Sequence, residues 1–464
     1  MSEATEGKPE CPGCIALRAQ LQKLEAKIRE LEARLNRNSS NSSKPPSTDA
    51  PWKRPPPQPP TGRKPGGQPG HTGACRTLLP ETAVKTFVDY VPRTCKRCGS
   101  PLPPEASPGE EPPTRHQVAE LPPQPLEITE HRGHARSCPR CGALTREEIP
   151  AEIRSHALGP RLSATLSYLS ARCRCSRRVV EELVETVFGL PLSLGTVIRH
   201  EAEMAEALKP AHEEIGAAVR AAGALNVDES GWFQKGKLCW MWVAAAIDVV
   251  LLKIAPSRSR DQMHEILGAE PPGVIGSDRC GVYGQLPLER RQLCWSHLGR
   301  DFQALVDYGG GAEKLGQSGL HAAAALFVEW KEFKRGRISR TELQARLKPV
   351  EEGLRMDLLA AVSGHPSKAA GLACRLLYVY SALWTFTIVE GVEPTNNHAE
   401  RQLRRSVQWR KVSFGSHSSD GSRFVERTLS IIQTLILRKR PILDFLTAVL
   451  STHRQGLSPP PVLV

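Results

Sequence analysis

The sequence predicts a multidomain α/β protein, and three patterns support this prediction. A leucine heptad near the N-terminus indicates a long helix, two C-x-x-C pairs indicate a small cysteine-rich module, and strand-like segments separated by helical ones indicate a sheet. At 464 residues the chain has room for roughly two to four domains. The patterns divide it into seven expected segments: residues 11–36, 37–85, 86–150, 155–215, 220–300, 301–390 and 391–455.

The composition favours a polyanionic partner. The formal net charge is +13 and the isoelectric point is about 9.2, and nucleic acid is the commonest partner of such basic proteins. We see neither a signal peptide nor an apolar run approaching the roughly 20 residues that span a bilayer, so we expect a cytoplasmic protein without a membrane partner. In that compartment cysteines stay reduced unless they bind a metal.

Residues 11–36 are predicted to form a coiled coil. Isoleucine at a and leucine at d favour a parallel two-stranded coil, so we expect a homodimer. The alternative is a single amphipathic helix that packs on its own domain. The prediction rests on apolar residues with alternating spacings of four and three: Leu17, Leu21, Leu24, Ile28, Leu31 and Leu35.

Residues 37–85 are predicted to be a basic disordered linker. Asn, Ser, Pro and Gly dominate, and residues 36–80 hold seven basic residues against one acid. Such a segment cannot bury enough apolar surface to offset the entropy lost on ordering. It is a flexible spacer, an arm that follows DNA phosphates, or both.

Two matched cysteine pairs predict one structural zinc ion within residues 86–150. Each pair is a C-x-x-C-G turn, in which two thiolates suit tetrahedral zinc and the glycine permits the tight turn. Strand-like segments are expected between the pairs, at 117–121 and 126–130. The alternative is four reduced thiols without a metal. The expected ligands are Cys95, Cys98, Cys138 and Cys141.

Residues 155–215 are predicted to be a helical DNA-binding domain. Helices are expected at 161–169, at 176–188 and, with Ser193 as N-cap, at 194–208. Two short helices around a glycine turn are typical of a helix-turn-helix, although a plain helical packing unit has the same pattern. Basic side chains favour DNA, and the candidate contacts are Arg177, Arg178 and Arg199.

Residues 220–300 have the order of elements of the ribonuclease-H-like fold. Asp228 ends the first expected strand and Asp278 ends the fourth, and that fold places such strands side by side. A predicted all-α insertion (301–390) precedes the C-terminal helices (391–455), which carry a third acid, Glu400. The expected strands are 223–228, 238–247 and 249–254, followed by a helix at 257–267 and strands at 273–278 and 291–295.

Several motifs in a fixed order, over almost the whole chain, resemble transposases of the IS-sixty-six insertion-sequence family. Two of them depart from the usual family text, because Asp-Glu-Ser replaces Asp-Glu-Thr and Asp278-Arg-Cys-Gly-Val-Tyr283 replaces a shorter Asp-Gly-Tyr-like run. Neither departure removes a carboxylate. Besides the heptad and the cysteine pairs, the motifs are Asn38-Ser-Ser-Asn-Ser-Ser-Lys-Pro-Pro, Gly66-Gly-Gln-Pro-Gly-His71, Asp228-Glu-Ser, Ser277-Asp278, Cys294-Trp-Ser-His297-Leu-Gly-Arg300 and Asn396-Asn-His-Ala-Glu-Arg401.

The resemblance implies a DDE transposase whose catalytic triad is Asp228, Asp278 and Glu400. Three carboxylates suit two Mg²⁺ or Mn²⁺ ions, which support strand cleavage at the element's ends and transfer of the 3′-OH to target DNA. The implied partners are terminal-repeat DNA, target DNA and accessory proteins of the same element. The implied location is the bacterial cytoplasm, in association with the nucleoid.

Basic residues around Glu400 are candidate phosphate contacts. Residues 396–440 contain ten Lys or Arg against three acids, and a residue four positions after Glu400 lies one helical turn away. The alternative is a solvated basic face. The candidates are Arg401, Arg404, Arg405, Arg410 and Lys411.

Two other functions stay open at this point: a non-catalytic, zinc-dependent DNA-binding regulator, and a structure-specific nuclease that does not join strands. For Cys294 and His297, packing at a strand end is favoured over metal binding. Three acids compete with the triad, each beside a motif rather than at its matching position: Glu229, Asp248 and Asp301.

Overall fold

The computed structural model describes most of the chain outside the predicted linker. The Gly66–His71 motif and most of residues 37–85 lie outside the described residues. The chain divides into two compact units, Arg54–Thr129 and the remainder. None of the described helices has the length and apolar character needed to cross a membrane. The described residues are 11–42, 44, 49, 78–104, 114–119, 126–141, 143–364 and 367–464.

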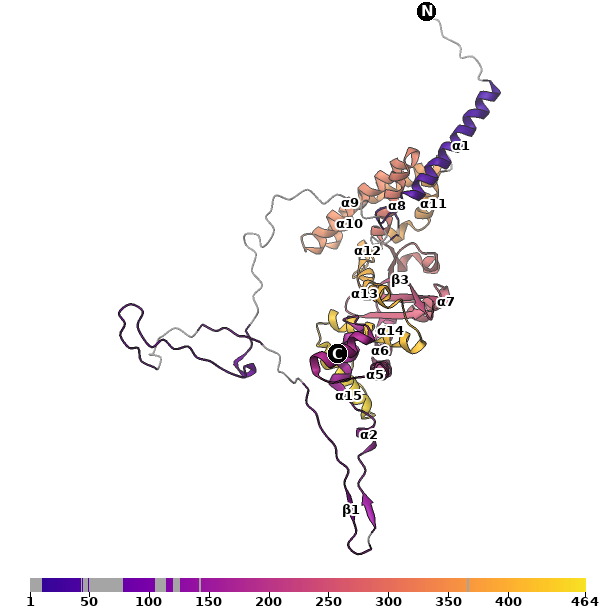
Figure 1. Cartoon of the computed structure of the whole chain (residues 1–464). Helices are drawn as coiled ribbons and strands as arrows, with labels where there is room; N and C mark the ends of the chain where they lie inside the picture. Colours follow the sequence, from indigo (N-terminus) through magenta and orange to yellow (C-terminus); the bar gives the residue numbers. More distant parts are fainter. Residues whose placement is uncertain are drawn as a thin grey trace, which may run out of the picture. The chain divides into compact units, whose positions relative to one another are not determined.

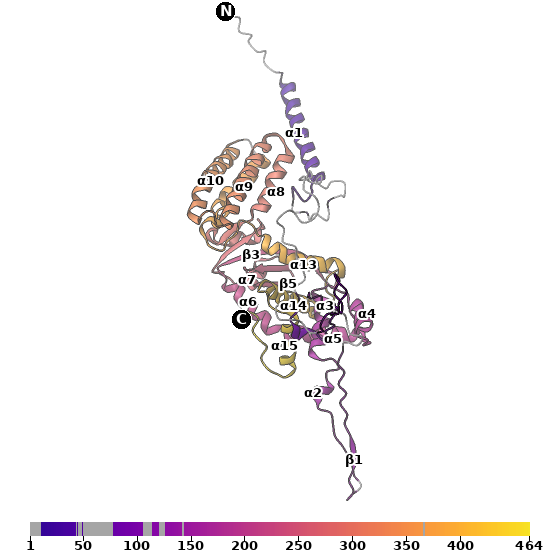
Figure 2. The same ribbon diagram turned by 90° about the vertical axis from the view of Figure 1, so that its left-hand side faces the viewer.

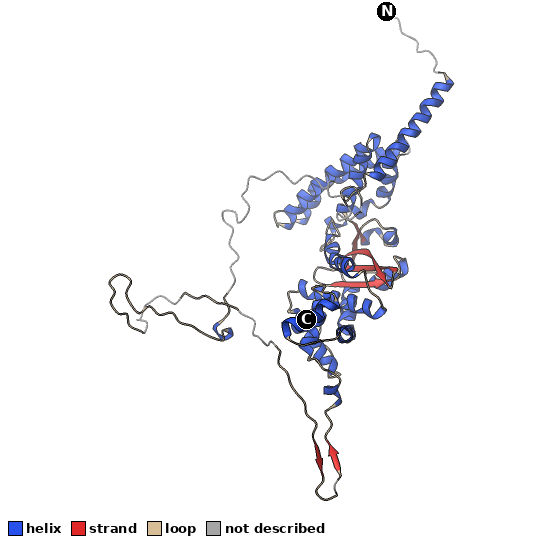
Figure 3. Ribbon diagram, in the orientation of Figure 1, coloured by secondary structure: helices blue, strands red, loops and turns tan. Residues whose placement is uncertain are grey.

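The structure is mixed α/β, as predicted, and a five-stranded sheet lies among its helices (Figure 3). The strand order is β5-β4-β3-β6-β7, with antiparallel pairs among the first three strands and parallel pairs to β6 and β7. The predicted order of strands and helix is therefore confirmed, but the first strand does not end at Asp228, because its pairing with β4 continues to Gln234. The bounds are β3 (Ala224–Gln234), β4 (Lys237–Ala245), β5 (Val250–Ala255), α7 (Arg260–Leu267), β6 (Val274–Ser277) and β7 (Arg291–Leu293).

The register between β3 and β6 sets the relative height of two aspartates. Asn226 pairs with Gly276 at the last paired position of the two parallel strands. Asp228 and Asp278 each follow two residues later, so they lie level with one another. Because side chains alternate along a strand and neighbouring strands are about 4.8 Å apart, we expect both aspartates on the same face of the sheet.

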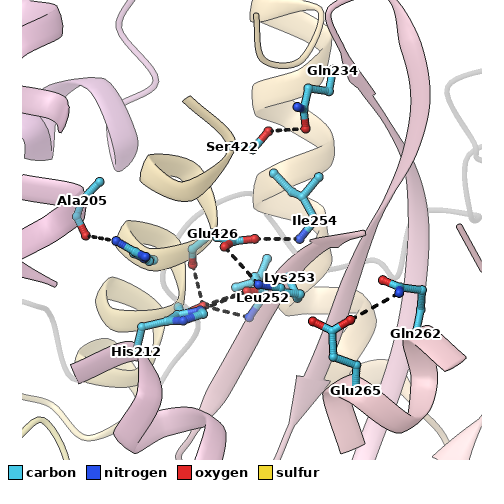
Figure 4. Close-up of polar contacts among 12 residues, drawn as sticks. Ala205, His212, Gln234, Leu252, Lys253, Ile254, Gln262, Glu265, Ser422 and Glu426 are labelled. Carbon is cyan, nitrogen blue, oxygen red and sulfur yellow. Dashed lines mark hydrogen bonds and ion pairs between the residues drawn. The ribbon is translucent and has the colours of Figure 1, made fainter. Parts of the chain in front are cut away.

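The free edge of β5 is covered by side chains of α14 (Ser419–Leu437), which take the place of a sixth strand (Figure 4). Unpaired backbone amides at a buried edge are costly, and one helical face supplies an acceptor at every turn. The hydrogen bonds are 2.8–3.1 Å long: Ile254 N–H donates to Glu426, Leu252 N–H to Ser430 and Val250 N–H to Thr434.

The helices before the sheet share its core. Ser193 caps α5 through the Thr196 amide, and Gly189 ends α4 with φ 68°, so both predicted boundaries are confirmed. α3 and α5 pack on α14 and on α15 (Ile442–Arg454), so they are continuous with the sheet's core. The bounds are α2 (Ala151–Arg154), α3 (Pro160–Ala171), α4 (Arg177–Phe188), α5 (Leu194–Ala207) and α6 (Lys209–Ala221).

A helical segment follows β7 (Figure 2), and its core also includes Val274 of β6 and Leu293 of β7. Apart from residues 365 and 366, residues 301–390 are described and contain no strand. The fifth strand ends at Leu293 rather than Trp295, because the buried Trp295 indole belongs to this helical core and donates to the Leu383 carbonyl at 2.8 Å. The bounds are α8 (Trp295–Tyr308), α9 (Glu313–Lys334), α10 (Arg340–Ser363), α11 (Lys368–Tyr378) and α12 (Thr385–Ile388).

The chain then returns to the sheet through α13 (Asn397–Ser413), which packs on β3 and β4. The predicted N-terminal helix is α1 (Pro12–Leu35, Figure 1), and none of its residues is buried. Its six seam residues are 45–79% exposed.

The strands expected at 117–121 and 126–130 are wrong. The described residues of these segments, 117–119 and 126–130, have no regular structure, whereas β1 (Ala135–Ser137) and β2 (Leu144–Arg146) form a hairpin around the second cysteine pair. Val118 and Ile128 are 83% and 76% exposed, so no core holds these apolar residues in a sheet. The prolines between the segments also lack amide donors.

His212 of α6, beside the edge of β5, makes the stability of the fold depend on pH (Figure 4). Its Nε2 lies 3.2 Å from the Leu252 carbonyl oxygen, and burial lowers its pKa to about 4. Because this folded pKa lies below the unfolded value of about 6.5, only the unfolded chain takes up the proton between these values. His212 therefore does not reduce the free energy of unfolding above pH 6.5, and it lowers this free energy by about 2–3 kcal/mol as the pH falls towards 4.

We expect His212→Gln to remove this part of the acid sensitivity. Urea unfolding at pH 7.5 and pH 4.5 measures it as a smaller loss of stability in the variant than in the wild type. His321→Gln, at an exposed position of α9, should keep the wild-type pH dependence. An equal loss in His212→Gln and wild type would contradict the burial argument.

Candidate active site

Two aspartates lie at the edge of the sheet face that packs against α13. Asp228 lies opposite Val243, whose side chain contributes to the core between the sheet and α13. The Glu229 amide donates to Asp228 Oδ1 at 2.9 Å, and the Cys280 amide donates to Asp278 Oδ1 at 2.8 Å. One oxygen of each aspartate is thus fixed by the backbone.

The start of α13 is tethered to the strand that carries Asp228. Asn396 is fully buried, its side-chain amide lies 3.4 Å from the Val227 carbonyl, and its backbone amide lies 3.4 Å from Cys294 Sγ. These contacts deliver Glu400, in the first turn of α13, to the same edge of the sheet.

The acids interact electrostatically. Burial raises the pKa of Asp228 well above its usual range, and the charges of Glu229, Glu400 and Asp278 raise it further. The amide that donates to Asp228 opposes this shift. The three acids predicted from the sequence therefore share one electrostatic neighbourhood, in which their charges repel.

A divalent cation would relieve this repulsion. Carboxylate oxygens are the preferred ligands of Mg²⁺ and Mn²⁺, so the donor set fits such an ion in kind and in charge. Among the residues that the structure describes, however, no three His, Cys, Asp or Glu side chains lie close enough together to hold one ion.

Glu400 also contacts two basic residues of α8. His297 Nε2 lies 3.7 Å from Glu400 Oε1, and Arg300 Nη2 lies 3.9 Å from the same oxygen. Burial and the Arg300 charge lower the pKa of His297, which favours the neutral imidazole. Cys294 is buried, and burial raises its pKa to about 11, so it is a packed thiol.

A second acid lies on the opposite face of the same strand. Glu229 accepts a hydrogen bond of 2.6 Å from the hydroxyl of the buried Tyr283 and pairs with Arg258 at 3.3 Å. The Arg258 guanidinium stacks on Trp240. The sequence alone did not predict this network, although the alternation along β3 places Glu229 on the face opposite to Asp228, and Tyr283 ends the Asp278 motif.

The other two competing acids are occupied elsewhere. Asp248 pairs with Arg438, and Asp301 pairs with Arg279 at 2.6 Å.

The predicted nucleic-acid contacts fall into different structural settings. Arg177 is paired with the buried Glu201 at 2.7 Å, and Arg410 hydrogen-bonds Ser230 and the Gly231 carbonyl. Both arginines therefore have partners within the protein. In contrast, the remaining exposed candidates face solvent: Arg178, Arg199, Arg401, Arg404 and Lys411.

The two cysteine pairs adopt the same turn. The Cys95 amide donates to the Ser100 carbonyl and the Cys138 amide to the Ala143 carbonyl, both at 2.8 Å. The first pair belongs to the unit Arg54–Thr129 and the second to the other unit. All four thiols are unbridged.

Comparison with known families identifies the chain. Residues 158–423, more than half of its length, match the family described as "Transposase IS66 family". Residues 10–77 match a family of unknown function. No curated protein matches the chain significantly. The matched span contains the sheet, the three acids and the start of α14, and the chain therefore belongs to the IS66 family of transposases.

Proposed function

We propose that this transposase cleaves DNA at the ends of an insertion sequence and transfers the freed 3′-OH into target DNA. Membership of the family implies a transposase role and DNA binding in general. The observation that supports the specific chemistry is the shared neighbourhood of Asp228, Asp278 and Glu400. The strand order, three antiparallel strands followed by two parallel ones, supports a ribonuclease-H-like core.

The three acids are the proposed ligands of two Mg²⁺ or Mn²⁺ ions. DDE transposases generally use divalent metal ions, and when bound these ions activate the attacking oxygen and stabilise the leaving one. The protein's part is positional: backbone amides orient Asp228 and Asp278, and His297 and Arg300 hold Glu400.

Two successive displacements at phosphorus account for the proposed activity. In the first, water forms a bond to phosphorus as the strand breaks and leaves a 3′-OH. In the second, that 3′-OH forms a bond to a target phosphate as a second strand breaks. The exposed Arg401 and Arg404 follow Glu400 on α13 and can neutralise neighbouring phosphates.

We expect Asp278→Asn to lower cleavage and joining of terminal-repeat DNA in Mg²⁺ by about 10²–10⁴-fold, because several kcal/mol of charge stabilisation are lost. Binding of the same DNA should stay within about threefold, as measured by fluorescence anisotropy. Asp444→Asn, which removes an exposed acid of α15, should keep both properties. Full cleavage by Asp278→Asn would overturn the assignment of this residue.

A pre-cleaved end with a free 3′-OH distinguishes the competing functions in the same assay. A transposase joins it to a target, whereas a nuclease cuts without joining. A regulator binds the end and does neither.

We also propose that Cys95, Cys98, Cys138 and Cys141 bind one structural Zn²⁺. The two matching turns support this, and hydrogen bonding with the Ser100 side chain and with the Cys141 backbone lowers the pKa of Cys98 and of Cys138, respectively. Thiolates are the form that binds zinc.

Elemental analysis of the purified chain should find about one zinc per chain, since four thiolates complete one tetrahedral site. Cys95→Ser and Cys138→Ser should each lose it, and Cys374→Ser, at an exposed position of α11, should not. Zinc retained in both of the first two variants would refute the site.

We propose that a second copy of the chain covers the exposed seam of α1. Although α1 contacts α8, its apolar stripe with heptad spacing contains no buried residue among the described part of the chain, which leaves the seam open to a second copy. Sedimentation should therefore give about twice the chain mass of 50.9 kDa. The double change Leu24→Glu and Ile28→Glu should give the single-chain mass, and Arg29→Gln, beside the seam, should not. A dimer that survives the double change would contradict the proposal.

A further inference from the structure

Three arginines gather between α3 and α13 without an acidic partner. Arg172 and Arg174 lie in the loop 172–176 that joins α3 to α4, and Arg405 lies on α13. Among the described residues none of the three forms an ion pair, and Arg174 only donates a hydrogen bond to Gln408. Burial and the charges of Arg172 and Arg174 lower the pKa of Arg405.

This arrangement is unfavourable for the protein alone. Arg405 Nη1 is buried and has no hydrogen-bond partner. Arg405 is only partly buried, but a guanidinium nitrogen that is buried without a partner costs stability, and two like charges beside it increase that cost. Arg177, the first residue of α4, shows the usual solution, because the buried Glu201 neutralises it. The group missing from the cluster is therefore an anion.

A cavity of about 370 Å³ opens beside the cluster, and Arg174 lines it. Two helices begin at its wall, α4 after Ser176 and α14 after Ser418, and helix amino ends carry partial positive charge. Trp409 of α13 supplies an aromatic wall. Glu201 also lines the cavity, but Arg177 neutralises it, so Arg174, Arg178 and the two helix ends leave the lining net positive. The cavity can thus take one anionic group of nucleotide size beside the Trp409 ring, which packs on Phe424.

We propose that the arginine cluster (Arg172, Arg174 and Arg405) and this cavity bind a backbone phosphate of the DNA strand. The inference rests on the proposed function and adds a second anchor for the same strand. Trp409 follows Glu400 by nine residues, about 14 Å along α13. That length spans about four phosphates of one strand, and the exposed Arg401 and Arg404 lie between the acids and the cluster.

The test measures DNA binding and stability on the full chain without Mg²⁺. Arg174→Gln and Arg405→Gln are compared with Arg346→Gln, which removes an exposed arginine of α10 that pairs with Glu329. A mixed-sequence duplex suffices, because phosphate contacts are independent of sequence. Affinity is measured at several salt concentrations, and thermal unfolding is followed without DNA.

We expect the first two variants to bind DNA about 10-fold more weakly, with a salt slope reduced by about 1. Their melting temperatures should be equal to or above that of the wild type, because like-charge repulsion is removed. Arg405→Lys should keep most of the slope, and Arg346→Gln should match the wild type. Lower melting temperatures with an unchanged slope would show a structural role and overturn the proposal.

Competition with inorganic phosphate shows whether the site binds a phosphate of DNA or free phosphate. We expect phosphate to compete with DNA only weakly, since it lacks the neighbouring contacts. If phosphate raises the melting temperature of the wild type but not of Arg405→Gln, without displacing DNA, the site takes free phosphate and the proposal is overturned. Because these measurements need no catalysis, a wild type that never cleaves would overturn the proposed chemistry alone.

Discussion

The parallel pairing of β3 with β6 is the constraint on which the site depends. It places Asp228 and Asp278 level on neighbouring strands, and a shift of one residue would turn one of them to the other face. The pairing begins at a close approach, because a Cβ on Gly273 would lie 2.2 Å from the Ala222 carbonyl oxygen. The tether of Asn396 to Val227 then brings Glu400 to the same edge.

The structure holds two clusters of opposite charge that do not neutralise each other. The acids lie around Asp228 of β3 and include Glu400 in the first turn of α13. The arginines lie around Arg405, five residues beyond Glu400 and about 8 Å further along the helix. Each cluster costs stability in the free protein. A bound DNA strand together with divalent cations would neutralise both clusters. Binding would therefore recover the stability that each cluster costs in the free protein.

Local sequence patterns were sufficient to predict the helices and strands. They were not sufficient to predict the contacts between residues that are distant in the sequence. The strands and the Ser193 cap followed from periodicity, and Asp278 directly follows β6 as predicted. Asp228, predicted to end its strand, instead lies inside β3, which continues to Gln234. Glu400 required the family resemblance, because 122 residues separate it from Asp278. The pairing of Arg177 with Glu201, the Tyr283 network and the arginine cluster join residues from different elements, so spacing does not reveal them. The segment 117–121 had a strand-like sequence, but its described residues 117–119 form no strand and Val118 is 83% exposed.

The most direct test of the central claim is cleavage of the protein by Fe²⁺ in place of Mg²⁺. With ascorbate, an iron ion held by the acids produces hydroxyl radicals that cut the nearby backbone. We predict cuts close to residues 228, 278 and 400 together, suppressed by excess Mg²⁺ and absent in Asp278→Asn. Cuts at only one of the three segments, or cuts unaffected by Mg²⁺, would contradict a shared metal site.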